Sequence, residues 1–193
     1  MIITVPNTLE LYKRSLIIDH CSPLQVILPL ADICLPNQFE AELLTERKIR
    51  TEEEAREVMD LLHSRGPHTV ILSSTELGND NFLLGLASRI TDGVKTVVRV
   101  EIPKFPAAFV GTGDLFTALC TAWLNKTEGD LKVSLERTIA TMQAVLTRTL
   151  SHAREAAARA GLEKPTAAMM ELKLIQSKED IEAPRDCVEA TVL

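Results

Sequence analysis

The sequence predicts an α/β protein in which helices cover the faces of a layered sheet. The first observation behind this prediction is that helical and extended patterns alternate along the chain. The second is the run TVILS at 69–73, which is apolar, β-branched and bounded by turn formers. The third is a pair of extended runs, 82–90 and 95–102, which flank Asp92-Gly93, a typical hairpin turn. With 193 residues, the chain suffices for one domain with a buried core or for part of a larger domain.

The first third of the chain predicts buried strand pieces followed by two helices. Residues 24–34 are mostly apolar on both sides of Pro29 and predict one or two strand pieces. A short helix is expected near Asn37. A longer helix is expected after Thr51, because Thr51 and Glu54 have the spacing of a capping box. The apolar positions of this second helix share one face: Ala55, Val58, Met59 and Leu62.

The rest of the chain predicts two further helices and a last strand. An apolar helix is expected directly after the stretch G-T-G-D at 111–114, and a long amphipathic helix over 131–160. Gly161 is its natural stop. The run ELKLIQ at 171–176 predicts the last strand. The inward faces of the two helices are expected to hold Leu115, Phe116, Leu119, Cys120, Trp123 and Leu124, and Leu131, Leu135, Ile139, Met142, Val145 and Leu150.

Composition and charge exclude several classes of function. The net charge is −6, aromatic residues make up 4% of the chain, and no predicted helix carries a basic stripe. Nucleic-acid binding needs clustered Lys and Arg, so we expect no nucleic-acid partner. The apolar stretch 16–30 is too short and too polar to span a bilayer, and no basic residue precedes the apolar N-terminus. We therefore expect a cytoplasmic chain without a membrane partner.

Neither the cysteines nor the histidines have the spacing of a metal site. No CxxC pair joins any of the four cysteines, and no HExxH pattern occurs among the four histidines. We expect reduced, mostly buried thiols and no structural zinc. The cysteines are Cys21, Cys34, Cys120 and Cys187.

The stretch G-T-G-D has the features of a phosphoryl-transfer turn. Glycines let the backbone approach a ligand closely, and the first N–H groups of a helix favour a bound anion. Asp114 would lie at this positive helix end and could accept the proton of an attacking hydroxyl. The alternative is that Asp114 is an ordinary N-cap in a glycine-rich turn. A GxxxxGK[ST] phosphate loop does not occur in the sequence.

Two other pairs of polar residues have both a structural and a functional interpretation. Asn37 and Glu40 form the N-x-x-E pattern of a capping box, but they could also face a nucleotide or its magnesium ion. Ser73 and Ser74 follow a predicted buried strand. Ligands of open α/β sheets gather at the carboxyl ends of the strands, although serines there can also be simple turn residues.

Several segments together resemble one known family. The stretches LADICLPNQFEAELL, TVILSS and FVGTGDLFTALCTAWL resemble, in order and spacing, the pyridoxal kinase branch of the ribokinase-like superfamily. The C-terminal stretches ELKLIQSKEDIEAP and VEATVL are similar to the ends of animal pyridoxal kinases. The resemblance covers about residues 28–193. It implies a ribokinase-like three-layer α/β/α sandwich around a mostly parallel sheet, incomplete because its early N-terminal strands are missing.

The resemblance also implies an activity. The family uses ATP to phosphorylate the 5′-hydroxyl of pyridoxal, pyridoxine and pyridoxamine, which salvages vitamin B6 as pyridoxal 5′-phosphate. It implies that Asp114 is the catalytic base in contact with the substrate, and that Gly111, Thr112 and Gly113 form the anion hole. The remaining implied roles are ATP binding by Asn37, Ser73, Ser74 and Thr112, and binding of Mg²⁺ by Glu40.

The sequence departs from the family pattern at two places. Leu35 stands where the family usually carries a threonine near the nucleotide, so use of a monovalent cation is in doubt. Residues 1–27 do not resemble the family, and we interpret 28–193 as the C-terminal, ATP-binding and catalytic part of an N-terminally truncated kinase. The alternative is an inactive nucleotide-binding remnant or an interaction fragment. The family is homodimeric, and a dimer of this chain stays open.

Overall fold

The computed structural model describes residues 2–4, 16–17, 28–185 and 188–193. Part of the predicted strand region 24–34, and both Cys21 and Cys187, lie outside the described residues. In chain order the described elements are β1 (Ile2–Thr4), β2 (Leu16–Ile17), the 3₁₀ helix η1 (Leu28–Leu30), β3 (Ile33–Cys34), α2 (Gln38–Thr45), α3 (Glu52–His63), β4 (Thr69–Thr75), β5 (Phe82–Thr91), β6 (Val94–Pro103), α4 (Thr112–Lys126), α5 (Leu131–Arg159), η2 (Ala167–Met170), η3 (Ile175–Ser177), α6 (Lys178–Glu182) and β7 (Ala190–Val192).

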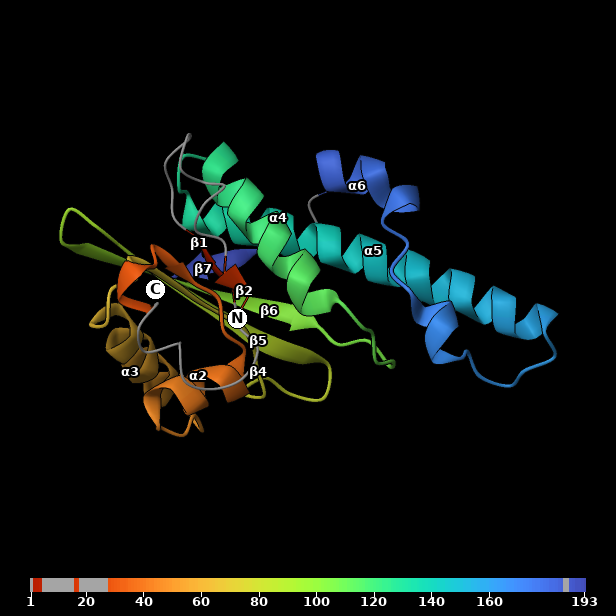
Figure 1. Ribbon diagram of the computed structural model, residues 1–193, viewed down its shortest axis with the longest axis horizontal. Coiled ribbons are helices and arrows are strands. Elements are labelled where there is room, and N and C mark those ends of the chain that lie inside the picture. Colours follow the sequence, from red (N-terminus) through yellow and green to blue (C-terminus); the bar gives the residue numbers. More distant parts are fainter. Residues whose placement is uncertain (1, 5–15, 18–27, 186–187) are drawn as a thin grey trace.

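The expected three-layer α/β/α arrangement is confirmed. The strands form one sheet in the order β2-β1-β3-β4-β5-β6-β7. Helices α2 and α3 cover one face of this sheet, and α4 and α5 cover the other (Figure 1). Helix α5 extends beyond the sheet, and the segment from η2 to α6 packs along this helix (Figure 1).

The expectation of a mostly parallel sheet is wrong for the described strands. Of the six pairings between described strands, only that of β3 with β4 is parallel. A parallel pair needs a crossover connection, and helices α2 and α3 supply one between β3 and β4. Strands β4, β5 and β6 follow one another through short connections, which force antiparallel pairing.

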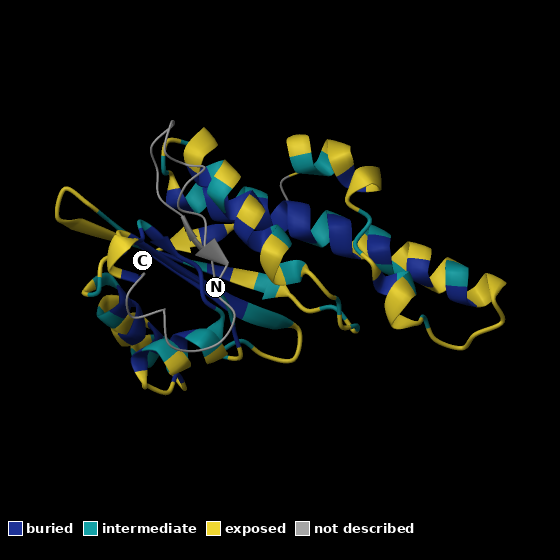
Figure 2. Ribbon diagram, viewed as in Figure 1, coloured by how far each residue is buried: buried dark blue, intermediate teal, exposed yellow. Residues whose placement is uncertain are grey.

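Two hydrophobic cores lie on opposite faces of the sheet because side chains alternate along each strand. Ile71 packs in the core beneath α4 and α5, while its neighbours Val70 and Leu72 pack beneath α2 and α3. The same alternation separates Leu86 from Ala87 on β5. Figure 2 shows the resulting buried band, which runs through the strands and along the inner sides of α4 and α5.

Most of the predicted elements are confirmed with their boundaries. Thr51 caps α3, and all four apolar residues assigned to its inner face are buried. The Asp92-Gly93 turn joins β5 and β6 with both residues at positive φ, 50° and 78°, as a tight hairpin requires. Helix α5 ends before Gly161, which has a φ of 68°. Of the twelve inward positions predicted on α4 and α5, Leu115, Trp123 and Leu150 are only partly buried.

The predicted strand at 171–176 is wrong. This segment is irregular and ends in η3, because it docks on α5 instead of joining the sheet. The Lys173 N–H donates to Thr149 Oγ1 at 3.1 Å, and the Arg148 guanidinium donates to Ser177 Oγ at 2.6 Å. The edge of β6 is instead taken by β7, from the apolar C-terminal tail. In this position Ile175 is 88% exposed.

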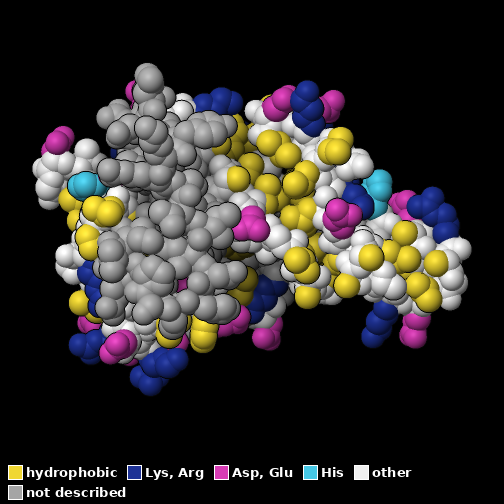
Figure 3. Space-filling model, viewed as in Figure 1, with side chains coloured by type: hydrophobic (Ala, Val, Ile, Leu, Met, Phe, Trp, Pro, Cys, Tyr) yellow, Lys and Arg dark blue, Asp and Glu magenta, His cyan; other side chains and the backbone are white. Residues whose placement is uncertain are grey.

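Exposed apolar side chains, the cysteines and the helix lengths complete the description of the fold. Hydrophobic side chains reach the surface over the part of the molecule around the C-terminal end of α5 (Figure 3), and Leu162, Leu174 and Ile175 are among the exposed apolar residues. Of the cysteines within the described ranges, Cys34 and Cys120 are buried and not disulfide-bonded. No helix in the described part of the chain has the length and apolarity needed to cross a bilayer.

Candidate active site

The glycine turn at 111–114 leaves the start of α4 open. Gly111 occupies the N-cap position in a left-handed conformation, with φ 83°, which glycine adopts without strain. The first helical hydrogen bond runs from Leu115 N–H to Gly111 C=O at 3.1 Å. Among the described residues, no side chain caps this helix. The N–H groups of Thr112, Gly113 and Asp114 precede that bond, so they lack an acceptor within the helix and can bind an anion.

Asp114 is the third residue of α4 and not its N-cap. Its side chain is exposed, and within the described ranges it makes neither a hydrogen bond nor an ion pair. The ordinary capping interpretation therefore does not describe this carboxylate. An exposed carboxylate at an electropositive helix start can accept a proton or approach a cation.

A cavity of about 180 Å³ brings together five of the site residues predicted from the sequence. They come from the start of α2, the end of β4 and the start of α4, so three separate segments meet there. Ser74 lies instead in a neighbouring cavity of about 420 Å³, which shares Asn37 with the first. Gly111 and Thr112 directly precede Gly113 in the sequence but do not line the first cavity. The residues lining the first cavity are Leu35, Asn37, Glu40, Ser73, Gly113, Asp114, Phe116 and Thr117.

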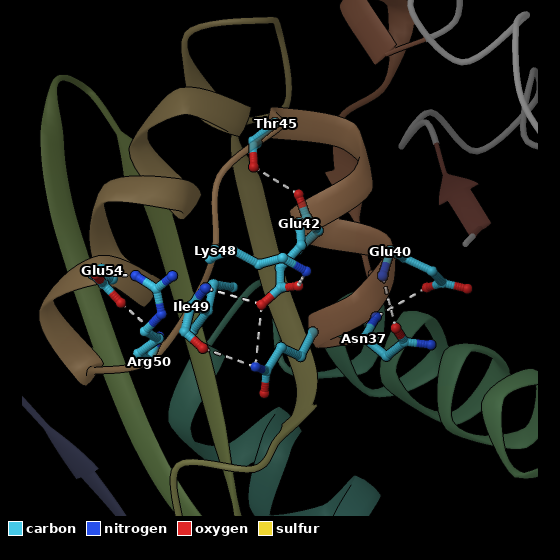
Figure 4. A network of polar contacts seen from close by, with 10 residues as sticks. Asn37, Glu40, Glu42, Thr45, Lys48, Ile49, Arg50 and Glu54 are labelled. Atoms are coloured by element: carbon cyan, nitrogen blue, oxygen red, sulfur yellow. Dashed lines mark hydrogen bonds and ion pairs between the residues drawn. The ribbon is translucent and has the colours of Figure 1, made fainter.

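Asn37 and Glu40 form the predicted capping box and also face this cavity. Asn37 Oδ1 accepts from the Glu40 N–H at 2.9 Å, and Glu40 Oε2 accepts from the Asn37 N–H at 2.9 Å (Figure 4). The two interpretations of this pair therefore do not exclude each other. The box fixes both side chains at the helix start, which is the position from which they reach the cavity.

Ser73 and Ser74 form a β-bulge at the end of β4. Leu72 pairs with Leu86 and Thr75 with Leu84, so the two serines oppose the single residue Gly85. A bulge re-aims the side chains it contains and is common next to active sites. Here it accompanies the division of the two serines between the two neighbouring cavities.

The part of the candidate site formed by the described residues is rich in oxygen and contains no basic side chain. Glu40 and Asp114 supply carboxylates, Asn37 an amide oxygen and Ser73 a hydroxyl. Oxygen donors of this kind suit Mg²⁺, which retains waters and takes few carboxylates. Among the described residues there is no group of three or more His, Cys, Asp or Glu arranged to hold a metal ion. A magnesium ion here would therefore need phosphate oxygens and waters as further ligands.

A buried thiol lies behind this site. Burial, with a smaller contribution from the negative charge of Glu40, raises the pKa of Cys34 to about 12. Cys34 packs in the core beneath α2 and α3, so it stays a neutral, apolar group at neutral pH. We assign it a packing role.

Two further residues of the cavity wall, Phe116 and Thr117, were not predicted as site residues. Phe116 is part of the core beneath α4, and Thr117 donates its hydroxyl to Gly113 C=O at 2.9 Å, which braces the glycine turn. A hydroxyl four residues after a glycine is the only local signal of this brace, and it is too common to identify a site.

Comparison with known proteins assigns the chain to a family. The model of the phosphomethylpyrimidine kinase family matches residues 15–161. Pyridoxal kinase from Bos taurus is 51% identical over 176 residues, which cover 86% of this chain and 55% of that protein. Pyridoxal kinase from Homo sapiens is 47% identical over 175 residues, covering 86% and 55%.

The fold is shared with solved kinase structures. Pyridoxal kinase from Leishmania donovani, in complex with ADP and pyridoxamine, superposes with a TM-score of 0.75 at 22% identity, over 88% of this chain and 54% of that one. The chain thus spans about half the length of the relatives that it matches. On the sequence match across most of its length, the chain belongs to the phosphomethylpyrimidine kinase family.

Proposed function

We propose that the chain carries the ATP-binding and catalytic part of a kinase, within residues 28–193, that phosphorylates the 5′-hydroxyl of pyridoxal, pyridoxine and pyridoxamine. The observation that carries this proposal is the exposed Asp114 carboxylate at an uncapped helix start, in one cavity with Asn37, Glu40 and Ser73. The relatives support the choice of substrate, since they are pyridoxal kinases.

In the proposed mechanism, Asp114 is the general base. It accepts the proton of the substrate hydroxyl while that oxygen forms a bond to the γ-phosphorus of ATP and the bond to the departing ADP breaks. The open N–H groups after Gly111 bind the oxygens of the transferred phosphoryl group. Donors fixed in this way stabilise the negative charge of the transition state without having to reorient.

The residues of α2 and β4 would hold the nucleotide and its metal ion. We assign Asn37, Ser73 and Ser74 to ATP, together with Thr112, and Glu40 to Mg²⁺. A bound Mg²⁺ supplies positive charge that offsets the charge of the phosphates. Glu40 would hold the ion, directly or through a water, while its Oε2 keeps the hydrogen bond from the Asn37 N–H. We place this activity in the cytoplasm.

A second candidate function is a nucleotide-binding remnant without turnover. The observation that favours it is the small size of the cavity at Asp114, about 180 Å³, which is below the range of complete small-molecule sites, about 300–1,000 Å³. The cavity would accept a phosphoryl group but not a vitamin as well.

Two measurements separate the candidates. Calorimetric titration with Mg-ATP should show binding under both, and the absence of binding at millimolar ATP would refute both and leave an interaction fragment. A coupled assay with pyridoxal and ATP should show product only if the kinase proposal holds. Binding without turnover would support the remnant.

A further inference from the structure

The side chain of Gln38 joins three segments around the candidate site. Its Nε2 donates to Ile49 C=O at 2.9 Å and to Glu42 Oε1 at 3.3 Å. Its Oε1 accepts from the Glu76 N–H at 2.8 Å. Ile49 lies before α3 and Glu76 directly after β4, so one half-buried amide on α2 bonds to chain on both sides of it.

The partners of this side chain fix its orientation. A backbone N–H can only donate and a backbone C=O can only accept, so the amide oxygen must face Glu76 and the amide nitrogen Ile49. Around Ile49, Glu42 accepts from the Ile49 N–H at 2.9 Å and pairs with Lys48 at 2.5 Å (Figure 4). The hydrogen bond from Lys48 lowers the pKa of Glu42, which keeps this acceptor charged. Gln38 is therefore held by a satisfied polar network.

The bond to Glu76 acts on the bulge of β4. On the sheet side, the buried hydroxyl of Thr75 donates to Leu84 C=O at 2.9 Å, which closes the ladder after the bulge. On the helix side, the Ser73 N–H donates to Pro36 C=O at 3.0 Å, and Gln38 binds the N–H of Glu76. The segment that contains both serines is thus hydrogen-bonded at one end of the bulge to Pro36, just before α2, and at the other end to Gln38 on α2.

We propose that Gln38 is a positioning residue, which holds the serines of the β4 bulge in register with Asn37 and Glu40 at the start of α2. This inference rests on the proposed function for its consequence on ATP, but the positioning itself can be measured without it. Without the Gln38 hydrogen bond, the segment after Ser74 is held on the sheet side, by the bond from Thr75 to Leu84, and no longer on the side of α2. A displacement of about 1 Å in a binding site weakens its function by as much as about a hundredfold.

The test compares Gln38→Met with Lys48→Met in the full chain. Methionine matches glutamine in length and helix propensity, so Gln38→Met should not unfold α2, and Lys48 lies beyond the end of this helix. Lys48 belongs to the same network but has no bond to β4, which makes it the matched control. Gln38→Glu keeps an acceptor oxygen for the Glu76 N–H and serves as the partial rescue. Amide hydrogen exchange at Glu76 by NMR, Mg-ATP calorimetry and turnover with pyridoxal are the readouts.

In Gln38→Met the Glu76 amide should exchange about tenfold faster, which corresponds to one lost hydrogen bond. The dissociation constant of Mg-ATP should rise about tenfold, while kcat should fall less than threefold. Gln38→Glu should exchange more slowly than Gln38→Met, and Lys48→Met should match the wild type. Unchanged exchange at Glu76 in Gln38→Met, or an equal change in Lys48→Met, overturns the proposal. If the wild type binds no Mg-ATP, the proposed function fails, and the exchange at Glu76 still decides whether Gln38 positions the bulge.

Discussion

Replacement of Asp114 by Asn is the sharpest test of the proposed chemistry. Asparagine has nearly the same shape as aspartate but cannot accept the hydroxyl proton as a carboxylate does. Because Asp114 has no hydrogen-bond partner in the described part of the chain, the change removes no contact from the folded state. The loss of a negative charge in the first turn of α4 costs about 0.3–1 kcal/mol, and for a chain of this length Tm should fall by about 1–4 °C.

The effect on turnover should be much larger than the effect on stability. Removal of a general base lowers kcat by about 10²–10⁴, which corresponds to about 2.7–5.4 kcal/mol. We expect this loss in a coupled assay with pyridoxal, with the Mg-ATP dissociation constant within about twofold of the wild type by calorimetry. The matched control is Asp130→Asn, the same change of charge at the start of α5, where the side chain is the N-cap and accepts from the Val133 N–H at 3.0 Å. Since asparagine is an equally good N-cap, this variant should keep both activity and Tm.

The results for the two variants decide whether Asp114 is the general base or a carboxylate with a structural role. If Asp114→Asn keeps the kcat of the wild type, or if Asp130→Asn loses as much activity, Asp114 is not the base. A loss of Mg-ATP binding in Asp114→Asn at unchanged Tm would instead assign the carboxylate to the metal ion.

The other predictions concern stability. In Gly129→Ala the new Cβ would lie 2.2 Å from the guanidinium of Arg89. This clash would disrupt the hydrogen bond of 3.2 Å that Arg89 donates to Gly129 C=O. The φ of Gly129, 88°, also disfavours alanine. We expect a loss of about 2–3 kcal/mol and a fall in Tm of about 5–10 °C by calorimetry. Gly93→Ala, at φ 78° with open space around it, should cost only about half as much; equal losses would contradict the role of the Arg89 contact. Burial lowers the pKa of His63 from 6.5, and its Nε2 lies 2.6 Å from Ser88 Oγ. The unfolded chain therefore binds more protons than the folded chain below about pH 6.5, and the free energy of unfolding should fall as the pH drops from there through the lowered pKa. Urea unfolding from pH 7.5 to 5 should show this slope, which should be absent in His63→Gln; an equal slope in the variant would assign it to other groups.

The sequence predicts this fold well wherever local chemistry decides the structure. The hairpin at Asp92-Gly93 and the helix after Thr51 follow from turn and capping rules, and both are confirmed. Prediction fails where two segments compete for one edge. The alternating run 171–176 and the tail at 188–193 both suit a strand, but only the tail pairs with β6, because the first run is fastened to α5 by bonds to residues about 25–30 positions away. No local pattern contains that information.

The site shows the same division between local and distant information. The capping box of Asn37 and Glu40 can be predicted from four consecutive residues, and the structure confirms it. The bulge at Ser73 and Ser74 is not readable, because it depends on Gly85 in the next strand. The requirement for glycine at position 85 depends in turn on β6, because a Cβ on residue 85 would lie 2.9 Å from the side chain of Val100. The meeting of Asn37, Glu40 and Ser73 with Asp114 in one cavity was expected from the family resemblance and not from any spacing in the sequence.

The two Gly-Asp pairs of this chain show why a sequence alone leaves the role of Asp114 open. Gly113-Asp114 and Gly129-Asp130 both precede an apolar helix, and a capping rule treats them alike. In the structure α5 begins directly after Asp130, so this side chain turns back and caps it. Helix α4 begins two residues before Asp114, since Gly111 takes the N-cap position, and the carboxylate is carried past the point where it could cap. Because Gly111 takes the N-cap position of α4, Asp114 faces a cavity, whereas Asp130 caps its helix and has a structural role. Gly111 also leaves the first backbone N–H groups of α4 without acceptors in the helix, close to the Asp114 carboxylate.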